Sequence, residues 1–106
     1  MSVGQGAAIF GCAGTRLLPE EREFFRDADP LGFILFARNV EDPRQVRRLT
    51  AELREAVGRD ALVLVDQEGG RVQRLRAPHW REWTPPLDMV DGAGSVGAAE
   101  RVMRLR

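Results

Sequence analysis

The sequence predicts an α/β fold, and three observations lead to that expectation. Three short runs are apolar throughout, a pattern typical of parallel strands that are covered on both faces. Amphipathic stretches with helical spacing separate these runs, and the connections are short, so strands and helices alternate along the chain. The three predicted strands are AAIFG, GFILFA and ALVLV, at residues 7–11, 32–37 and 61–65.

The first predicted helix lies within residues 15–26, between the first two strands. Pro19 suits its first turn, where a helix needs no amide hydrogen. Leu18, Phe24 and Phe25 can share one apolar face. An Asp-Pro pair then ends the element, because the residue before a proline avoids helical backbone.

The second predicted helix begins at Asp42 and Pro43, with Asp42 as the N-cap and Pro43 in the first turn. Gly58 is a typical helix stop. Apolar residues recur at helical spacing between these signals, and charged residues fill the other side as a solvated face. The apolar positions are Val46, Leu49, Leu53 and Val57, and the outer ones are Arg47, Arg48, Glu52 and Arg54.

Beyond the third strand the sequence predicts irregular structure as far as Pro86. A last helix is expected from about Ser95, with Val102 and Leu105 facing inward. No stop signal follows, so this helix is expected to be still running at Arg106.

The pattern leaves two architectures open, an open doubly wound sheet and the beginning of a (β/α)8 barrel. A barrel typically needs about 250 residues. The 106 residues of this chain would therefore supply about three βα units of one.

Composition narrows the function classes. Sixteen basic and 16 acidic residues give a net charge of zero, which removes the electrostatic argument for nucleic acid or an anionic membrane. The chain has a single cysteine, Cys12, which excludes an internal disulfide and a multi-cysteine metal site. We interpret Cys12 as a small buried group after the first predicted strand. The N-terminus has no basic segment followed by a long apolar run, so a cytoplasmic protein without cofactor or metal is expected.

The segment DQEGGRVQRL, which starts at Asp66, carries the chemistry. Its carboxylate directly follows a predicted strand, and ligands of parallel α/β folds bind at the carboxyl ends of strands. Asp66 can accept hydrogen bonds from adjacent sugar hydroxyls, and Arg74 can donate several in a fixed fork. Gly69 and Gly70 allow a sharp turn with positive φ or a close approach to a ligand.

On this local pattern alone, a purely structural interpretation of the segment has the same weight as sugar binding. Asp66 could cap the turn, and Glu68 could pair with Arg71 or Arg74 merely to hold the loop.

Three ordered blocks carry a resemblance to a known family. They are LGFILFARNVEDPRQVRRLTAELR, LVLVDQEGGRVQRLR and the pair Pro85-Pro86, together spanning roughly Gly11 to Pro86. They resemble the start of glycoside hydrolase family 3, specifically the bacterial β-N-acetylhexosaminidases. The family shares the strand ending in ILFxRN, the helix starting at EDP and the motif D-(Q/H)-E-G-G-R-V-Q-R. The resemblance implies that residues 1–106 are the incomplete N-terminal part of a TIM-type catalytic barrel.

The resemblance also implies roles for the motif. Asp66 and Arg74 would hold the non-reducing N-acetylglucosamine, and Glu68, Gly69, Gly70 and Arg71 would support the loop. The family is retaining, and its nucleophilic aspartate and acid/base histidine are expected beyond Arg106, so the chain itself would contain no catalytic residue and would be inactive alone. The expected substrate is a muropeptide fragment with terminal β-linked N-acetylglucosamine, processed during cell-wall recycling, and the full-length enzyme is expected to be monomeric.

Two alternatives remain, a family 3 hydrolase of β-glucosidase type and a non-catalytic module that binds a sugar or nucleotide. GAGSVG, at residues 92–97, formally matches a dinucleotide fingerprint, but PPLDMVD before it is a poor strand. His79 is the only histidine and is expected to be a loop residue rather than the catalytic one. Trp80 and Trp83 are expected to anchor the loop more than to bind sugar.

Overall fold

The computed structural model describes residues 6–106, so the first five residues of the N-terminal segment lie outside the described residues. The chain divides into two compact units, residues up to Val65 and residues from Asp66 onward. The expectation that residues 1–106 form one incomplete domain stays a prediction. Within the described part, no helix has the length and apolar character needed to cross a membrane.

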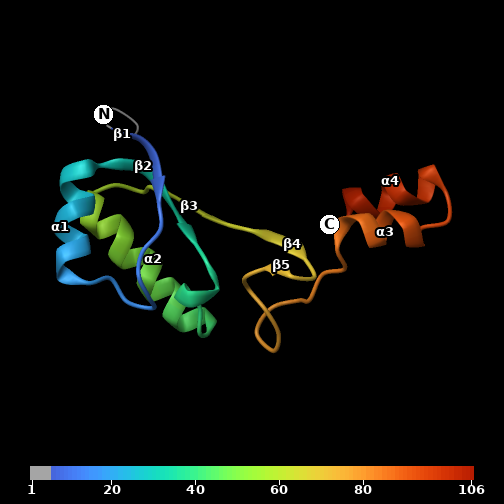
Figure 1. Ribbon diagram of the computed structural model, residues 1–106, viewed down its shortest axis with the longest axis horizontal. Helices are drawn as coiled ribbons and strands as arrows, with labels where there is room; N and C mark the ends of the chain where they lie inside the picture. The colour runs from blue at the N-terminus through green and yellow to red at the C-terminus, as the bar shows by residue number, and fades with distance from the viewer. Residues whose placement is uncertain (1–5) are drawn as a thin grey trace. The chain divides into compact units, whose positions relative to one another are not determined.

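The first unit is a parallel sheet with connecting helices (Figure 1). Its three strands are hydrogen-bonded in sequence order, and both pairings are parallel. The α/β expectation with parallel βα units is therefore confirmed. The elements are β1 (Gly6–Phe10), α1 (Pro19–Ala28), β2 (Pro30–Leu35), the short 3-10 helix η1 (Ala37–Asn39), α2 (Pro43–Val57) and β3 (Leu62–Val65).

The core lies between the central strand and the two helices. Phe33 of β2 is 1% exposed, and its ring meets that of Phe25 from α1 edge to face, with centroids 5.0 Å apart. Leu49 and Leu53 of α2 are both 0% exposed. Each fully buried side chain of this size contributes about 1.5–3 kcal/mol, so these residues hold both helices on one face of the sheet.

The other face of the sheet differs from the prediction. Ile9, Leu62 and Leu64 are 43%, 53% and 42% exposed, although all three lie in runs that are apolar throughout. Side chains alternate between the faces of a strand, and within residues 6–106 the first unit's helices cover only one of them. Coverage on both faces, which the sequence predicted, is therefore not observed here.

The local helix signals explain where α2 begins and ends. The Asp42 carboxylate accepts a hydrogen bond from the Gln45 amide at 2.8 Å, as an N-cap does. Gly58 ends the helix with a φ of 67°, a left-handed conformation that glycine adopts readily. Both boundaries agree with the sequence prediction.

The apolar face predicted for α1 is only partly confirmed. Phe25 is buried, but Phe24 is 55% and Leu18 is 41% exposed. Leu18 lies outside the helix as its N-cap residue. Phe24, one residue from Phe25, is turned to the margin of the core, where its ring meets Phe10 edge to face at 5.5 Å.

The second unit begins with an antiparallel hairpin of two short strands, followed by two helices that pack against each other. The prediction of irregular structure up to Pro86 was thus wrong for the hairpin, which is too short to show a strand period in the sequence. It also missed the first of the two helices. The elements are β4 (Gln67–Gly69), β5 (Val72–Gln73), α3 (Pro86–Gly92) and α4 (Val96–Arg104).

The last helix starts as predicted and ends earlier than predicted. The Ser95 hydroxyl accepts a hydrogen bond from the Ala98 amide at 3.1 Å and caps the start of α4. The helix stops at Arg104 instead of running through Arg106, and Leu105 is 84% exposed rather than facing inward. The Leu105 amide still donates to the Arg101 carbonyl oxygen at 3.2 Å, and the Arg106 guanidinium donates to the Thr84 carbonyl oxygen at 2.6 Å, within the same unit.

Candidate functional site

Asp66 and Arg74, the two predicted sugar-binding residues, lie side by side across the β4–β5 hairpin. The Arg74 amide donates to the Asp66 carbonyl oxygen at 3.2 Å. Their side chains form an ion pair, with 3.6 Å between the Arg74 guanidinium and Asp66 Oδ2. The Asp66 side chain is 47% exposed and that of Arg74 is 24% exposed. A carboxylate and a guanidinium therefore stand together within reach of a ligand.

Both side chains have hydrogen-bonding capacity to spare. The 3.6 Å separation is longer than a hydrogen bond. In the described part of the chain the Asp66 carboxylate accepts no hydrogen bond from a side chain, and Arg74 Nε is buried without a partner. Such a pair suits a polyhydroxylated ligand, since the carboxylate can accept from hydroxyl groups while the guanidinium donates to them.

The turn between the strands depends on two glycines. Gly69 has a φ of 110° and Gly70 a φ of 61°, the positive values that the sequence predicted. A Cβ on Gly69 would lie 2.6 Å from the Trp83 carbonyl oxygen, and one on Gly70 would lie 2.6 Å from Pro85 Cγ. These positions therefore admit only glycine without a shift of the 83–85 segment.

The two other predicted loop supports contribute less than expected. Glu68 is exposed, and within residues 6–106 no ion pair joins it to Arg71 or Arg74. Arg71 acts through its main chain, because its carbonyl oxygen accepts from the Arg74 guanidinium at 3.4 Å. The pairing of Glu68 that a purely structural interpretation required is not observed.

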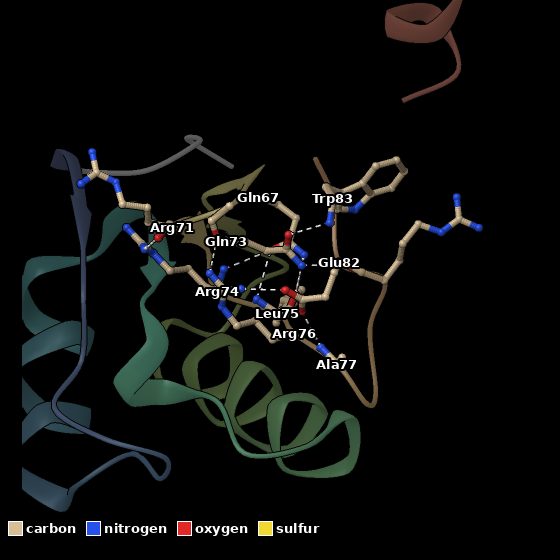
Figure 2. A network of polar contacts seen from close by, with 11 residues as sticks. Gln67, Arg71, Gln73, Arg74, Leu75, Arg76, Ala77, Glu82 and Trp83 are labelled. Carbon is tan, nitrogen blue, oxygen red and sulfur yellow. Dashed lines mark hydrogen bonds and ion pairs between the residues drawn. The ribbon is translucent and has the colours of Figure 1, made fainter. Parts of the chain in front are cut away.

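Sequence reasoning missed the side chains that hold this loop (Figure 2). Arg76 donates to the Gly70 carbonyl oxygen and, at 2.7 Å, to Glu82 Oε1. The second Glu82 oxygen accepts from the Ala77 amide at 2.7 Å. Gln67 and Gln73 bind several main-chain groups of the same loop. Gln67 and Gln73 lie inside the motif, Arg76 directly follows it and Glu82 lies further along the loop, but their residue types carry no signal of their own.

The aromatic residues after the motif belong to the loop. Trp83 is half-buried, and the guanidinium carbons of Arg81 and Arg106 lie 5.2 and 5.5 Å from its ring centroid. His79 is exposed, with its ring 5.8 Å from that of Trp80. These contacts join the tryptophans to other side chains of the second unit, and the prediction that they anchor the loop to the core stays a prediction.

The other residues and motifs that the sequence analysis considered do not form a binding or catalytic site among the described residues. Cys12 is 4% exposed, and burial raises the pKa of its thiol, so the group is held in its neutral form. Gly92 closes α3 and Gly97 lies in α4, so a helix precedes the GAGSVG segment where a dinucleotide site needs a strand. Among the described residues, no cluster of three histidine, cysteine or acidic side chains could hold a metal ion.

The surface hollows lie elsewhere. The larger, of about 660 Å³, is lined by residues at the start of α1, and the second, of about 440 Å³, by residues at the end of α2. Neither is lined by a residue that the sequence analysis names as a candidate for binding or catalysis, and both are open depressions rather than enclosed cavities. The Asp66–Arg74 pair stays the candidate site on its chemistry.

Comparison with known proteins identifies relatives over part of their length. No protein-family model matches the chain. A β-hexosaminidase of Pseudomonas aeruginosa is 51% identical over 72 residues, which cover 68% of this chain and 21% of that protein. A β-hexosaminidase of Stenotrophomonas maltophilia is 46% identical over 79 residues, which cover 74% of this chain and 23% of that protein. The chain thus spans less than a quarter of these curated relatives.

Solved structures give the same result. NagZ from Neisseria gonorrhoeae, in complex with zinc ion, matches with a TM-score of 0.75 and 33% identity over 93% of this chain and 30% of that one. The same protein in complex with N-trifluoroacetyl-D-glucosamine gives a TM-score of 0.73 and 32% identity, over 91% of this chain and 29% of that one. A glycoside hydrolase family 3 β-N-acetylglucosaminidase from Paenibacillus gives 0.72 and 29%, over 91% and 18%.

These matches also distinguish the two architectures that the strand order leaves open, an open doubly wound sheet and a barrel. Three strands in sequence order occur both in one half of a dinucleotide-binding sheet and in a barrel. The similarity to part of family 3 NagZ identifies the units of the barrel fold. The resemblance stated from the sequence is confirmed as a partial match.

Proposed function

Since this chain is related to the bacterial β-hexosaminidases of glycoside hydrolase family 3 over part of their length, we propose that it contributes to a retaining glycosidase. The polypeptide that carries it would release terminal β-linked N-acetylglucosamine. Within this proposal residues 6–106 bind sugar, and the nucleophilic aspartate and acid/base histidine belong to polypeptide outside them.

The observation that carries the proposal is the Asp66–Arg74 pair. Its carboxylate directly follows β3, and its guanidinium lies 3.6 Å away on a side chain that is 24% exposed. We assign Asp66 to the outer hydroxyls of the non-reducing sugar and Arg74 to the same ring. A related protein, NagZ from Neisseria gonorrhoeae, was solved with N-trifluoroacetyl-D-glucosamine, which supports a ligand of this kind.

The chemistry follows from the retaining class. A carboxylate attacks the anomeric carbon while an acid protonates the leaving oxygen, and water then hydrolyses the glycosyl-enzyme with the same acid acting as a base. Residues that grip hydroxyl groups remote from the reacting bond add binding energy and orient the ring for attack. We propose that Asp66 and Arg74 bind and orient the sugar ring in this way.

The biological setting is part of the proposal. We place the reaction in the cytoplasm, on muropeptide fragments with a terminal N-acetylglucosamine, during cell-wall recycling, and propose that the full-length enzyme acts as a monomer. Support for this setting comes from the kinship with bacterial β-hexosaminidases alone.

The test is hydrolysis of p-nitrophenyl N-acetyl-β-glucosaminide by the polypeptide that carries this chain. Asp66→Ala should lower kcat/KM about 10- to 100-fold, the loss expected for a charged hydrogen bond to the substrate. Asp60→Ala is the matched control, because the Asp60 side chain is 95% exposed and lies outside the motif. It should leave kcat/KM unchanged.

Three outcomes contradict parts of the proposal. Unchanged kinetics of Asp66→Ala would remove Asp66 from the sugar site. Faster hydrolysis of p-nitrophenyl β-glucoside than of the N-acetyl compound would favour a β-glucosidase-type enzyme. Hydrolysis by the purified 106-residue chain alone would overturn the assignment of the catalytic groups to polypeptide outside it.

A further inference from the structure

Two glutamines face each other across the hairpin that carries the candidate site. Gln67 of β4 and Gln73 of β5 are register partners in the antiparallel pair. Gln73 is 2% exposed, and Gln67 is half-buried. A buried amide costs free energy unless its donors and acceptor are satisfied, so the partners of these side chains show what the two amides hold.

Gln67 binds the main chain at Arg74 and the residue after it (Figure 2). Its Oε1 accepts from the Arg74 amide at 3.2 Å and from the Leu75 amide at 3.0 Å. Its Nε2 donates to the Leu75 carbonyl oxygen at 2.7 Å. One side chain therefore binds three successive peptide units, from the Arg74 amide to the Leu75 carbonyl oxygen.

Gln73 binds the same carbonyl oxygen and also main-chain groups of residues 81–83. Its Nε2 donates to the Leu75 carbonyl oxygen at 2.8 Å and to that of Arg81 at 2.7 Å. Its Oε1 accepts from the Trp83 amide at 2.9 Å. The two glutamines thus meet at one carbonyl oxygen, and together they tie the segment directly after β5, which bears Arg74, to the 81–83 segment.

The Arg74 side chain is held far more loosely than its main chain. Its guanidinium lies 3.6 Å from Asp66 Oδ2 and 3.4 Å from the Arg71 carbonyl oxygen. Its Nε has no partner. Such long contacts are weaker than hydrogen bonds of normal length. The main chain is therefore the part of Arg74 that the surrounding residues hold most firmly.

We propose that Gln67 and Gln73 are positioning residues: they fix the main chain of Arg74 and Leu75 so that the Arg74 guanidinium stands beside the Asp66 carboxylate before any sugar arrives. This rests on the proposed function for its catalytic consequence. A main chain fixed in advance at Arg74 limits the positions open to its guanidinium and so leaves less conformational entropy to be lost on binding, and the glutamines thereby act on affinity without touching the ligand.

The first experiment tests the positioning itself, without substrate. In the 15N-labelled 106-residue chain, NMR would follow hydrogen exchange of the Leu75 amide and of the Arg74 Nε proton, which is buried. Gln67→Met keeps the length of the side chain and removes all three hydrogen bonds. Both protons should exchange at least about tenfold faster in this variant, because the main-chain grip is lost.

Gln45→Met is the matched control. Gln45 is 3% exposed, and its amide also makes three main-chain contacts, accepting from Glu41 and donating to Thr15 and Asn39. Gln45 lies in the first unit. Its substitution should lower the stability of the chain by a similar amount and leave the exchange of the Leu75 amide and Arg74 Nε protons unchanged. Gln67→Glu keeps the acceptor and loses the donor, so an intermediate acceleration is expected even where the methionine variant fails to fold.

The second experiment measures the consequence in the polypeptide that carries this chain. Gln67→Met should lower kcat/KM for p-nitrophenyl N-acetyl-β-glucosaminide about tenfold, and Gln45→Met should not. Equal proton exchange in wild type and in both Gln67 variants would overturn the positioning proposal, whatever the kinetics. Absence of hydrolysis by the wild-type polypeptide would instead overturn the proposed function, whatever the exchange shows.

Discussion

Gly69 has no room for a side chain, and this makes Gly69→Ala a stringent test of the hairpin geometry. The backbone there has a φ of 110°, and an added Cβ would lie 2.6 Å from the Trp83 carbonyl oxygen and 2.7 Å from that of Thr84. A sparsely populated φ costs an L-residue about 1–3 kcal/mol, and a forced shift of packed atoms costs about 1–3 kcal/mol more. The substitution should therefore cost the second unit about 2–6 kcal/mol.

Tryptophan fluorescence during urea unfolding measures this cost selectively. The chain has two tryptophans and no tyrosine, and Trp80 and Trp83 both lie in the second unit. Gly69→Ala should move the fluorescence transition to lower urea or abolish it. A transition at the wild-type urea concentration would refute the reasoning, because it would mean that the loop accommodates a Cβ at this position.

Gly58→Ala separates the two contributions. Gly58 also has a positive φ, 67°, but no atom lies within 4 Å of an added Cβ. This variant should carry only the conformational cost, about 1 kcal/mol, and in the first unit. Far-UV circular dichroism should show that small loss while the tryptophan transition stays unchanged.

Three further predictions concern the first unit. Cys12, 4% exposed and with its thiol pKa raised by burial, should resist iodoacetamide at about pH 8 until the chain unfolds, and alkylation at the rate of an unfolded peptide would contradict its burial. Arg16 donates to Glu52 at 3.1 and 3.2 Å and holds the pKa of that carboxyl below its usual 4.5. The ion pair therefore stabilises the folded chain at pH values above 4.5, and this stabilisation is lost as the pH falls through the lowered pKa. Glu52→Gln should therefore lower the melting temperature at neutral pH and not in strong acid; an equal loss at both would refute the pairing. Asn39→Leu should cost about 2–4 kcal/mol in a denaturant titration, because the buried Asn39 amide donates to the Cys12 and Gly14 carbonyl oxygens; a neutral substitution would mean that these carbonyls find other partners.

The sequence predicted the elements whose signals are local. Asp42 and Gly58 set the ends of α2 because an N-cap and a left-handed stop depend only on the residues beside them. The parallel strands were visible as apolar runs, and the family resemblance rested on ordered blocks in the same segments. Asp66 and Arg74 were singled out by their place after the third strand, and the structure brings them together.

The last helix and the apolar strand faces show where local patterns stop being sufficient. Leu105 has the helical spacing of an inward-facing residue, yet it is 84% exposed in the described part of the chain. Leu62 and Leu64 are as apolar as Phe33, yet only Phe33 is buried, since the helices of the first unit pack on one face of the sheet. Apolarity predicts a tendency to be buried, and the number of covering elements decides whether burial occurs.

The candidate site divides in the same way. The sequence by itself determined which residue types carry charge and where the glycines permit a turn, because those are properties of single residues. Only the tertiary structure decided that Gln67 and Gln73, rather than Glu68 and Arg71, make most of the hydrogen bonds that hold the loop around Arg74. The physical reason is that an amide can satisfy main-chain donors and acceptors together once folding brings them within 3 Å or so, and nothing in the residue type announces those partners beforehand.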